Sequence, residues 1–192
     1  QQDISVARKQ AALVIVALHK GIVHTPAVIA DYELVLARAA IDAGADIVIG
    51  HHAHIIRGIE FYKGRPIFHG LGNGCVVTHA LDPNQQHVKR AQWAERRKKL
   101  FGFEPDPEYF LAPFHPEAVN GFMAKILWHE DGAIEAGIIP VHVDPPGRPR
   151  LANEDEVIRV CAYLQKINLA AGLAQLKLTP RDDMVLVHES ES

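Results

Sequence analysis

Two apolar segments joined by a helical segment constrain the fold of this chain more than any other feature of its sequence. Residues 11–18 are continuously apolar and rich in β-branched side chains, which predicts a strand buried on both faces. Residues 46–49 predict a second short buried strand. Between them, residues 31–43 carry an apolar stripe at helical spacing, formed by Tyr32, Val35, Leu36, Ala39 and Ala43. Asp31 is the expected N-cap of this helix, and Gly44 is expected to end it. This order predicts a βαβ unit with two parallel, neighbouring strands and a right-handed crossover.

Histidines follow both predicted strands. His19 ends the first strand, and His51, His52 and His54 follow the second. Because the carboxyl ends of parallel strands meet at one edge of a sheet, with neighbouring strands roughly 4.8 Å apart, we expect these side chains to converge. In an extended segment, His52 and His54 point to the same side. Two imidazoles on one side make half of a metal site. The alternative is a polar surface loop or a hydrogen-bonded histidine pair.

The residues around these histidines resemble a known family. Residues 18–21, 43–54 and 58–73 together resemble the CapA family, which is named for capsule and poly-γ-glutamate synthesis and belongs to the calcineurin-like metallophosphoesterase superfamily. The resemblance is dense from residue 13 to residue 73 and weaker over residues 121–143. It implies an α/β fold, namely the C-terminal half of a metallophosphoesterase-like α/β/β/α sandwich with a mixed sheet. Residues 1–192 are then one partial domain with a loop and helix insertion at about residues 79–120.

The resemblance also implies a metal centre. Two divalent metal ions are expected in the complete protein, with His19, His52 and His54 as the ligands from this chain. Imidazole ligands suit Mn, Fe or Zn better than Mg. We expect His51 to be catalytic, as a proton donor or as a group that orients a ligand. Asn73 and Arg57 are the expected substrate-binding residues. The alternative for the Gly-rich residues 71–74 is a turn that only ends a strand.

The chain departs from the family after the first histidine, around residues 69–74 and upstream of residue 13. The family usually has Trp-Gly after the first histidine, where this chain has Lys20 and Gly21. The aspartates and the Asn-His pair of the superfamily would lie before residue 13, where Asp3 is the only carboxylate of this sequence. We therefore expect this chain to be the C-terminal half of a family-sized protein. Its expected partner is the missing N-terminal half, supplied by the same gene or by a second chain.

The remaining sequence predicts two hairpins and a long helix. Residues 57–62 and 65–71 form the first hairpin, and residues 122–128 and 133–141 form the second, around Asp131-Gly132. Asn153 is expected to begin a helix, with Glu156 as its capping-box partner, and Gly172 is expected to end it. Residues 184–187 predict a last edge strand.

Two segments in the middle of the chain are open to more than one interpretation. Residues 85–100 predict a helix that carries six Lys and Arg residues, which indicates either a solvated face or a contact for a polyanionic substrate. Residues 101–116 are rich in Pro and aromatic residues, which predicts an ordered loop that acts as a lid or a partner surface.

Composition narrows the function classes. The formal net charge of −3 gives no case for nucleic acid binding. No apolar stretch reaches the roughly 20 residues that span a membrane, and two cysteines far apart in the sequence do not predict a disulfide framework. Two hypotheses remain: a metal-dependent hydrolase or phosphoesterase acting in poly-γ-glutamate or capsule polymer synthesis, and a non-catalytic assembly component that keeps the fold. Either would be bacterial, and cytoplasmic or associated with the cell envelope.

Overall fold

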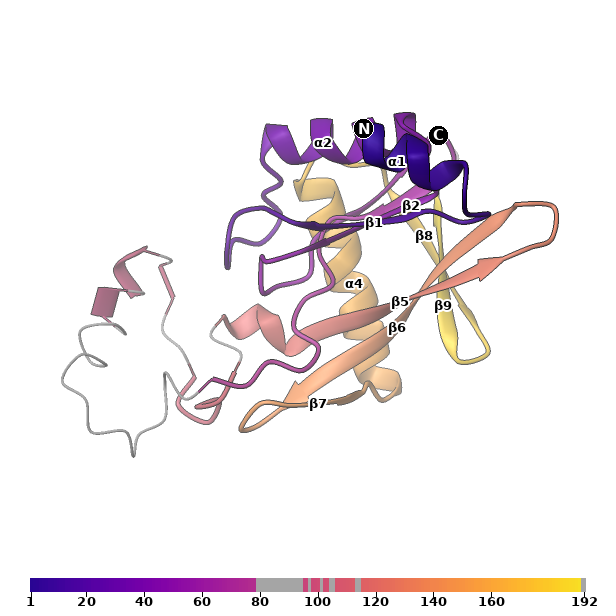
Figure 1. Cartoon of the computed structure of the whole chain (residues 1–192). Coiled ribbons are helices and arrows are strands. Elements are labelled where there is room, and N and C mark those ends of the chain that lie inside the picture. Colours follow the sequence, from indigo (N-terminus) through magenta and orange to yellow (C-terminus); the bar gives the residue numbers. More distant parts are fainter. Residues whose placement is uncertain (79–94, 97, 101, 104–105, 113–114, 191–192) are drawn as a thin grey trace.

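The first sheet of the molecule carries the predicted βαβ unit (Figure 1). The computed structural model describes residues 1–78, 95–96, 98–100, 102–103, 106–112 and 115–190. The strand order of this sheet is β1 (Ile15–His19), β2 (Ile47–His51), β4 (Arg65–Phe68) and β3 (Ile59–Tyr62). The pairs β1–β2 and β2–β4 are parallel, whereas β3 and β4 form an antiparallel hairpin. The predicted α/β fold with a mixed sheet is confirmed.

Helix α2 (Asp31–Asp42) connects β1 to β2 and covers one face of this sheet. Its buried residues are Glu33, Ala37, Ala40 and Ile41, and the apolar ones among them pack against Val48 and Ile67. The predicted apolar stripe is wrong for Tyr32, Val35 and Leu36, which are exposed. The helix lies on the sheet through small alanines instead, which allow a close approach of the helix backbone. The N-cap is Ala30 rather than Asp31, and Gly44 follows the C-cap with φ 109° as expected.

Strand β1 is the edge of the first sheet, and alternate residues along it are exposed. Ile15 is 51% exposed, so the prediction of a strand buried on both faces is wrong. Helix α1 (Gln2–Arg8) precedes β1, and Arg8 donates to the Asp46 carboxylate at 2.5 Å. The same carboxylate accepts the backbone N–H of Val14 at 2.8 Å, which ties the starts of β1 and β2 together.

The second sheet is antiparallel. Its order is β5 (Asn120–Trp128), β6 (Ile134–Asp144), β9 (Met184–Glu189) and β8 (Leu176–Arg181), and β7 (Arg148–Leu151) also pairs with β6. The predicted β5–β6 hairpin is confirmed. Strand β9 is not an edge strand, because β8, which the sequence pattern does not reveal, pairs along its outer side.

Helix α4 (Glu154–Ala170) begins with the predicted capping box. The Asn153 side chain accepts the Glu156 N–H at 3.0 Å, and the Glu156 carboxylate accepts the Asn153 N–H at 2.8 Å. Gly172, with φ 72°, follows the end of the helix. A short 3-10 helix, η1 (Pro116–Val119), leads into β5.

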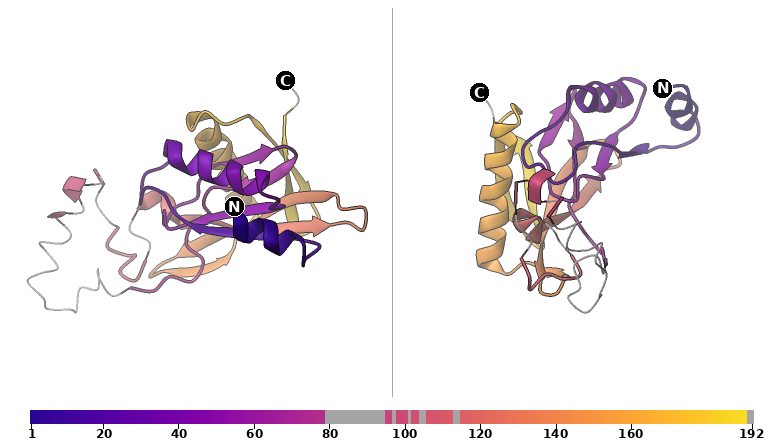
Figure 2. Two further views of the ribbon diagram at one scale, coloured as in Figure 1. Left: turned by 45° about the horizontal axis from the view of Figure 1, so that its top comes forward. Right: turned by 90° about the vertical axis from the view of Figure 1, so that its left-hand side faces the viewer.

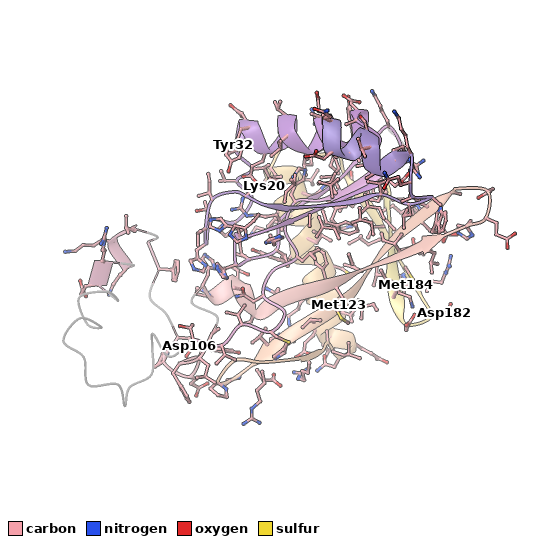
Figure 3. All side chains as sticks on the ribbon, in the orientation of Figure 1. Lys20, Tyr32, Asp106, Met123, Asp182 and Met184 are labelled. Atoms are coloured by element: carbon pink, nitrogen blue, oxygen red, sulfur yellow. The ribbon has the colours of Figure 1, made fainter. Side chains whose placement is uncertain are left out.

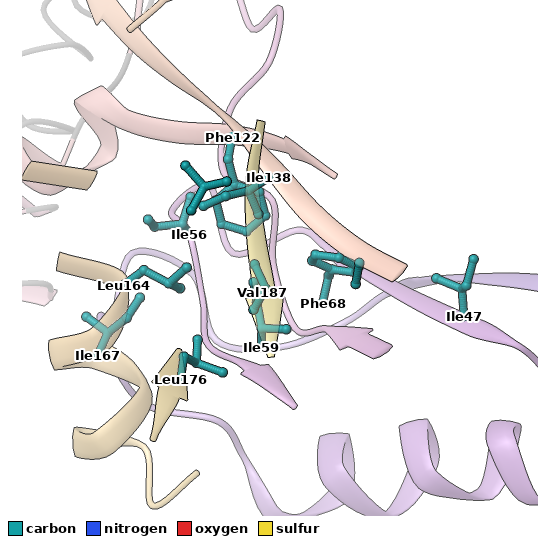
Figure 4. Close-up of a cluster of buried hydrophobic side chains, with 12 residues drawn as sticks. Ile47, Ile56, Ile59, Phe68, Phe122, Ile138, Leu164, Ile167, Leu176 and Val187 are labelled. Atoms are coloured by element: carbon teal, nitrogen blue, oxygen red, sulfur yellow. The ribbon is translucent and has the colours of Figure 1, made fainter. Parts of the chain in front are cut away.

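One hydrophobic cluster joins both sheets and α4, and Figure 4 shows most of its members. Ile47, Ile59 and Phe68 come from the first sheet, Ile138 and Val187 come from the second, and Leu164 and Ile167 come from α4. Figure 2 shows α4 along one side of the molecule and α1 on the other.

Parts of the prediction lie outside the described residues. The greater part of the predicted insertion at residues 79–120 lies outside the described residues, and so does most of the basic segment 85–100. Within that segment, residues 95–96 and 98–100 are described and are helical. Within the described part of the chain, no helix is long and apolar enough to cross a membrane.

Candidate functional site

The carboxyl ends of β1 and β2 bring His19 and His51 side by side. The two residues are partners in the parallel register, and the next backbone N–H, that of Lys20, donates to the His51 carbonyl at 3.0 Å. The structure therefore brings the histidine at the end of β1 next to the histidine motif at the end of β2, as predicted.

Three imidazole rings form a cluster at this edge. Both nitrogens of His19 are engaged: Nδ1 lies 2.8 Å from Nδ1 of His51, and Nε2 lies 2.8 Å from Nδ1 of His52. The ring centroids are 4.7 and 4.5 Å apart, with the rings in edge-to-face arrangement. A neutral imidazole has one donor and one acceptor nitrogen, so a neutral His19 satisfies both contacts at once.

His52 is held neutral by its surroundings. Desolvation lowers its pKa below the usual 6.5, and the neighbouring His19, His54 and His51 lower it further, against the opposite influence of Glu33. A neutral imidazole keeps a nitrogen lone pair, which is the form that binds metal ions.

The loop after β2 is not extended. His52 has φ 105° and His54 has φ 58°, both in a region that side chains other than glycine rarely adopt. The expectation that His52 and His54 share a side because the segment is extended is therefore wrong. Such strain is typical of functional loops that the surrounding structure holds in place.

His54 pairs with Asn73. Its Nδ1 lies 2.9 Å from the Asn73 side-chain oxygen, and the Asn73 amide donates to the His54 carbonyl at 3.3 Å. Because an amide oxygen only accepts hydrogen bonds, His54 donates through Nδ1, and its Nε2 retains the lone pair. Asn73, predicted to bind substrate, is in this structure the residue that fixes the orientation of His54.

His24 belongs to the same region, although the sequence analysis did not select it. His24 is buried, and its backbone N–H donates to the Ala53 carbonyl at 2.9 Å. Its ring centroid lies 5.5 Å from that of His54. The ring centroid of Phe103 lies 6.0 Å from that of His24 and 4.6 Å from that of His115. The sequence signal was the position of His24 in the loop that leaves β1, five residues after His19.

Arg57, the other predicted substrate-binding residue, is 1% exposed. Its Nη2 donates to the Ile22 carbonyl in the loop after β1, whereas Nε and Nη1 have no hydrogen-bond partner among the described residues. Burial lowers the pKa of this guanidinium, and the nearby Glu33 carboxylate opposes that change. The structure thus places Arg57 beneath the histidine loops rather than on an open surface.

Lys20 and Glu33 form a buried ion pair next to Arg57. The ammonium lies 2.9 Å from the carboxylate, and the two side chains are 4% and 2% exposed. Tyr32 accepts the neighbouring Gly21 N–H through its hydroxyl at 2.9 Å. Figure 3 shows Lys20 and Tyr32 at the same end of α2.

The donor chemistry fits part of a metal centre. Two imidazole nitrogens bound to one tetrahedral zinc ion lie about 3.3 Å apart, and the facing nitrogens of His19 and His52 lie 2.8 Å apart. Within the described residues, no group of three or more His, Cys, Asp and Glu side chains has the arrangement of a metal site.

Comparisons with known proteins agree with the resemblance. The profile of the bacterial capsule synthesis protein family PGA_cap matches residues 1–76. An uncharacterized protein of Sinorhizobium fredii, y4sH, is 64% identical over 159 residues, which cover 74% of this chain and 34% of that protein. The PGA biosynthesis protein CapA of Bacillus subtilis is 47% identical over 94 residues, covering 45% of this chain and 24% of that protein.

A third relative matches a shorter part of the chain. A probable polyglutamine synthesis accessory protein of Mycobacterium tuberculosis is 46% identical over 41 residues, covering 21% of this chain and 11% of that protein. The chain spans about a third of the length of the two Sinorhizobium relatives that it matches.

Proposed function

Because the chain belongs to the CapA family of bacterial capsule synthesis proteins, we propose that it acts in the synthesis of a capsule polymer or poly-γ-glutamate as part of a metal-dependent hydrolase. The observation that carries the proposal is the histidine cluster at the ends of β1 and β2, where His19 contacts both His51 and His52 at 2.8 Å. Rings in mutual contact at the carboxyl edge of a parallel sheet are placed where α/β proteins bind their ligands.

In this proposal, His19 and His52 are metal ligands, and His54 offers its Nε2 as a third. Asn73 orients His54 by accepting from its Nδ1, as outer partners of metal-binding histidines generally do. A divalent ion supplies Lewis-acid catalysis of ester or amide hydrolysis when it is bound. Imidazole ligands favour Mn, Fe or Zn, with two ions in the complete protein.

His51 is the proposed proton-transfer residue. Its Nδ1 lies within hydrogen-bonding distance of His19, which sets the direction of its ring, and the residue itself is exposed. An exposed imidazole next to the ligands is suited to donate a proton to a leaving group.

The remaining ligands are proposed to come from a segment outside this histidine cluster. The relatives are long enough to contain such a segment, because the aligned part is 34% of the length of the Sinorhizobium proteins. An N-terminal half with carboxylates, in the same protein or in a second chain, is the proposed partner. The substrate is proposed to be a phosphodiester or an acidic polymer such as poly-γ-glutamate.

A non-catalytic role in polymer assembly is the second candidate. One observation favours it: the Mycobacterium relative is named as a probable accessory protein of polyglutamine synthesis. Under this hypothesis the fold and the histidine loops serve assembly rather than hydrolysis.

Hydrolysis assays distinguish the two candidates. The chain, combined with a family N-terminal half, is incubated with a chromogenic phosphodiester or with poly-γ-glutamate, in the presence of Mn²⁺, Zn²⁺ or a chelator. The proposal predicts metal-dependent turnover that His52→Ala abolishes and that His188→Ala, at an exposed histidine of β9, leaves unchanged. A protein that binds metal but turns over neither substrate would contradict hydrolysis and support the assembly role.

A further inference from the structure

Beneath the histidine cluster, three buried charged side chains come from three different segments. Lys20 follows β1, Glu33 lies in the first turn of α2, and Arg57 follows the loop after β2. Each is less than a tenth exposed. Buried charges are costly unless they are paired, so the arrangement of these three side chains constrains the segments that carry them.

Glu33 is the anion of this group. One of its oxygens accepts from the Lys20 ammonium at 2.9 Å, and the other accepts the Ala30 N–H at 3.0 Å. Although burial raises the pKa of Glu33, the Lys20 and Ala30 hydrogen bonds and the charges of Lys20 and Arg57 hold it below its usual value. The carboxylate is therefore ionised at neutral pH and balances part of the charge of two cations.

The two residues that carry the cations lie in the strand-end loops. Lys20 follows His19 in the chain, and its backbone N–H donates to the His51 carbonyl at 3.0 Å. Arg57 donates to the Ile22 carbonyl through its side-chain Nη2, and its backbone N–H donates to the Gly70 carbonyl at 3.0 Å. Arg57 thus joins the loops that leave β1, β2 and β4, which hold His19, His54 and Asn73.

The fit around the Glu33 carboxylate is tight. A Cβ added at Gly21 would lie 2.8 Å from a Glu33 carboxylate oxygen, which is closer than real Cβ atoms approach. Gly21 also has φ 112°, which side chains disfavour. The backbone after His19 therefore lies directly on the carboxylate, and its path depends on where that group sits.

We propose that Glu33 is a positioning residue for the histidine cluster: its carboxylate holds the Lys20 side chain in an ion pair, packs under the Gly21 backbone and offsets the nearby Arg57 charge, and so keeps the strand-end loops in the arrangement that brings His19 and His52 together. The inference rests on the proposed metal site, since it assigns the support of that same site. Glu33 touches no reacting atom in this role and acts only through the loops.

The test compares Glu33→Gln with a matched variant of the same helix. Glutamine keeps the shape and an oxygen for the Ala30 N–H, but it removes the negative charge. The control is Asp42→Asn at the other end of α2, where the carboxylate forms an exposed ion pair with Lys63 at 2.5 Å. Exposed pairs of this kind contribute little to stability.

Two readouts at one fixed pH separate positioning from mere stability. The first is the set of ring ¹⁵N and ¹H chemical shifts of the histidines in the metal-free protein. The second is the affinity for Zn²⁺, measured by competition with a chromophoric chelator. We expect Glu33→Gln to change the ring shifts of His19, His51 and His52 and to weaken Zn²⁺ binding by about 10- to 100-fold, the usual effect of losing an outer partner of metal ligands. Asp42→Asn should leave both readouts as in the parent protein.

Ring shifts and Zn²⁺ affinity that match the parent protein, together with a lower melting temperature, would overturn the proposal and leave Glu33 as a helix cap only. If Glu33→Gln does not fold, Glu33→Asp retains the charge, and its Zn²⁺ affinity should be reduced by less than tenfold; a larger loss would overturn the role of the charge. If the parent protein binds no Zn²⁺, the metal site fails, while the ring shifts still decide the role of Glu33.

Discussion

Replacing Gly50 with alanine should disturb the sheet and the site together. Gly50 lies in β2 between Ile49 and His51, opposite the end of β4. A Cβ at this position would lie 2.3 Å from the His69 carbonyl oxygen, 2.8 Å from the His69 carbonyl carbon and 3.2 Å from the Phe68 carbonyl oxygen. These are backbone atoms, so no flexible side chain can move aside. The strands would have to separate by about 1 Å to restore ordinary van der Waals contact.

The cost follows from that displacement. Overpacking a rigid interior costs about 1–3 kcal/mol, and backbone contacts place Gly50→Ala toward the upper end of that range. For a chain of this size, about 2–3 kcal/mol corresponds to a melting temperature lower by about 4–12 °C. The adjacent His51 should also move away from His19, which a change in the His51 ring chemical shifts would report.

Differential scanning calorimetry measures the effect, with Gly74→Ala as the matched control. A Cβ at Gly74 meets no atom within 4 Å, and Gly74 is not among the positive-φ glycines. That control should melt within about 2 °C of the parent protein, as surface substitutions usually do. Equal melting temperatures for Gly50→Ala and Gly74→Ala would refute the close approach of β2 and β4.

Other predictions concern charge, exposure and the core. The Glu156 pKa is about 2 because of the hydrogen bond from Arg150, below the ordinary 4.5, so its contribution to stability is complete above about pH 4.5 and is lost as the pH falls toward 2. The melting-temperature difference between the parent protein and Glu156→Gln should shrink over that range, and a constant difference would contradict the assignment. Val35 is 69% exposed, so Val35→Lys should keep the melting temperature and improve solubility. Ile41→Lys, at a buried position of the same helix, should prevent folding. Equal effects of the two substitutions would contradict the orientation of α2. Leu164→Ala should lower the free energy of unfolding by about 2–5 kcal/mol, measured by urea unfolding, because the side chain is fully buried in the cluster of both sheets and α4. A decrease below about 1 kcal/mol would show that this cluster is loosely packed.

Local signals in the sequence predicted the elements that depend on neighbouring residues. Lys63 and Gly64, which lie between the two predicted strands, form the turn of the β3–β4 hairpin with φ 52° and 73°. The capping box of Asn153 and Glu156 begins α4 as predicted. The parallel pairing of β1 and β2, which brings His19 beside His51, followed from the βαβ order alone.

Features that depend on tertiary contacts were not predictable in the same way. Helix α2 has apolar residues on more than one face, and the choice of Ala37 and Ala40 over Val35 reflects the close packing of small residues on Val48. Strand β8 contains Lys177 and Pro180, which interrupt the apolar pattern expected of a strand. The strand forms by pairing with β9.

The path of the histidine loop also depends on distant partners. His52 and His54 have positive φ, and contacts from the β1 loop and from Asn73 hold the segment in this conformation. Periodicity along the chain carries no signal for such a loop, which is why the pairing of His54 with Asn73 and the approach of His24 to His54 appear only in the structure.

Zinc titration of the chain by isothermal calorimetry tests the central claim most directly. The parent protein, His19→Ala, His52→Ala and His188→Ala are titrated under identical buffer conditions. We predict that the parent protein and His188→Ala bind Zn²⁺ with equal affinity, and that His19→Ala and His52→Ala each bind at least about tenfold more weakly, because each variant loses one imidazole ligand. Zn²⁺ affinity that is unchanged in both His19→Ala and His52→Ala would show that the cluster at the ends of β1 and β2 is not a metal site.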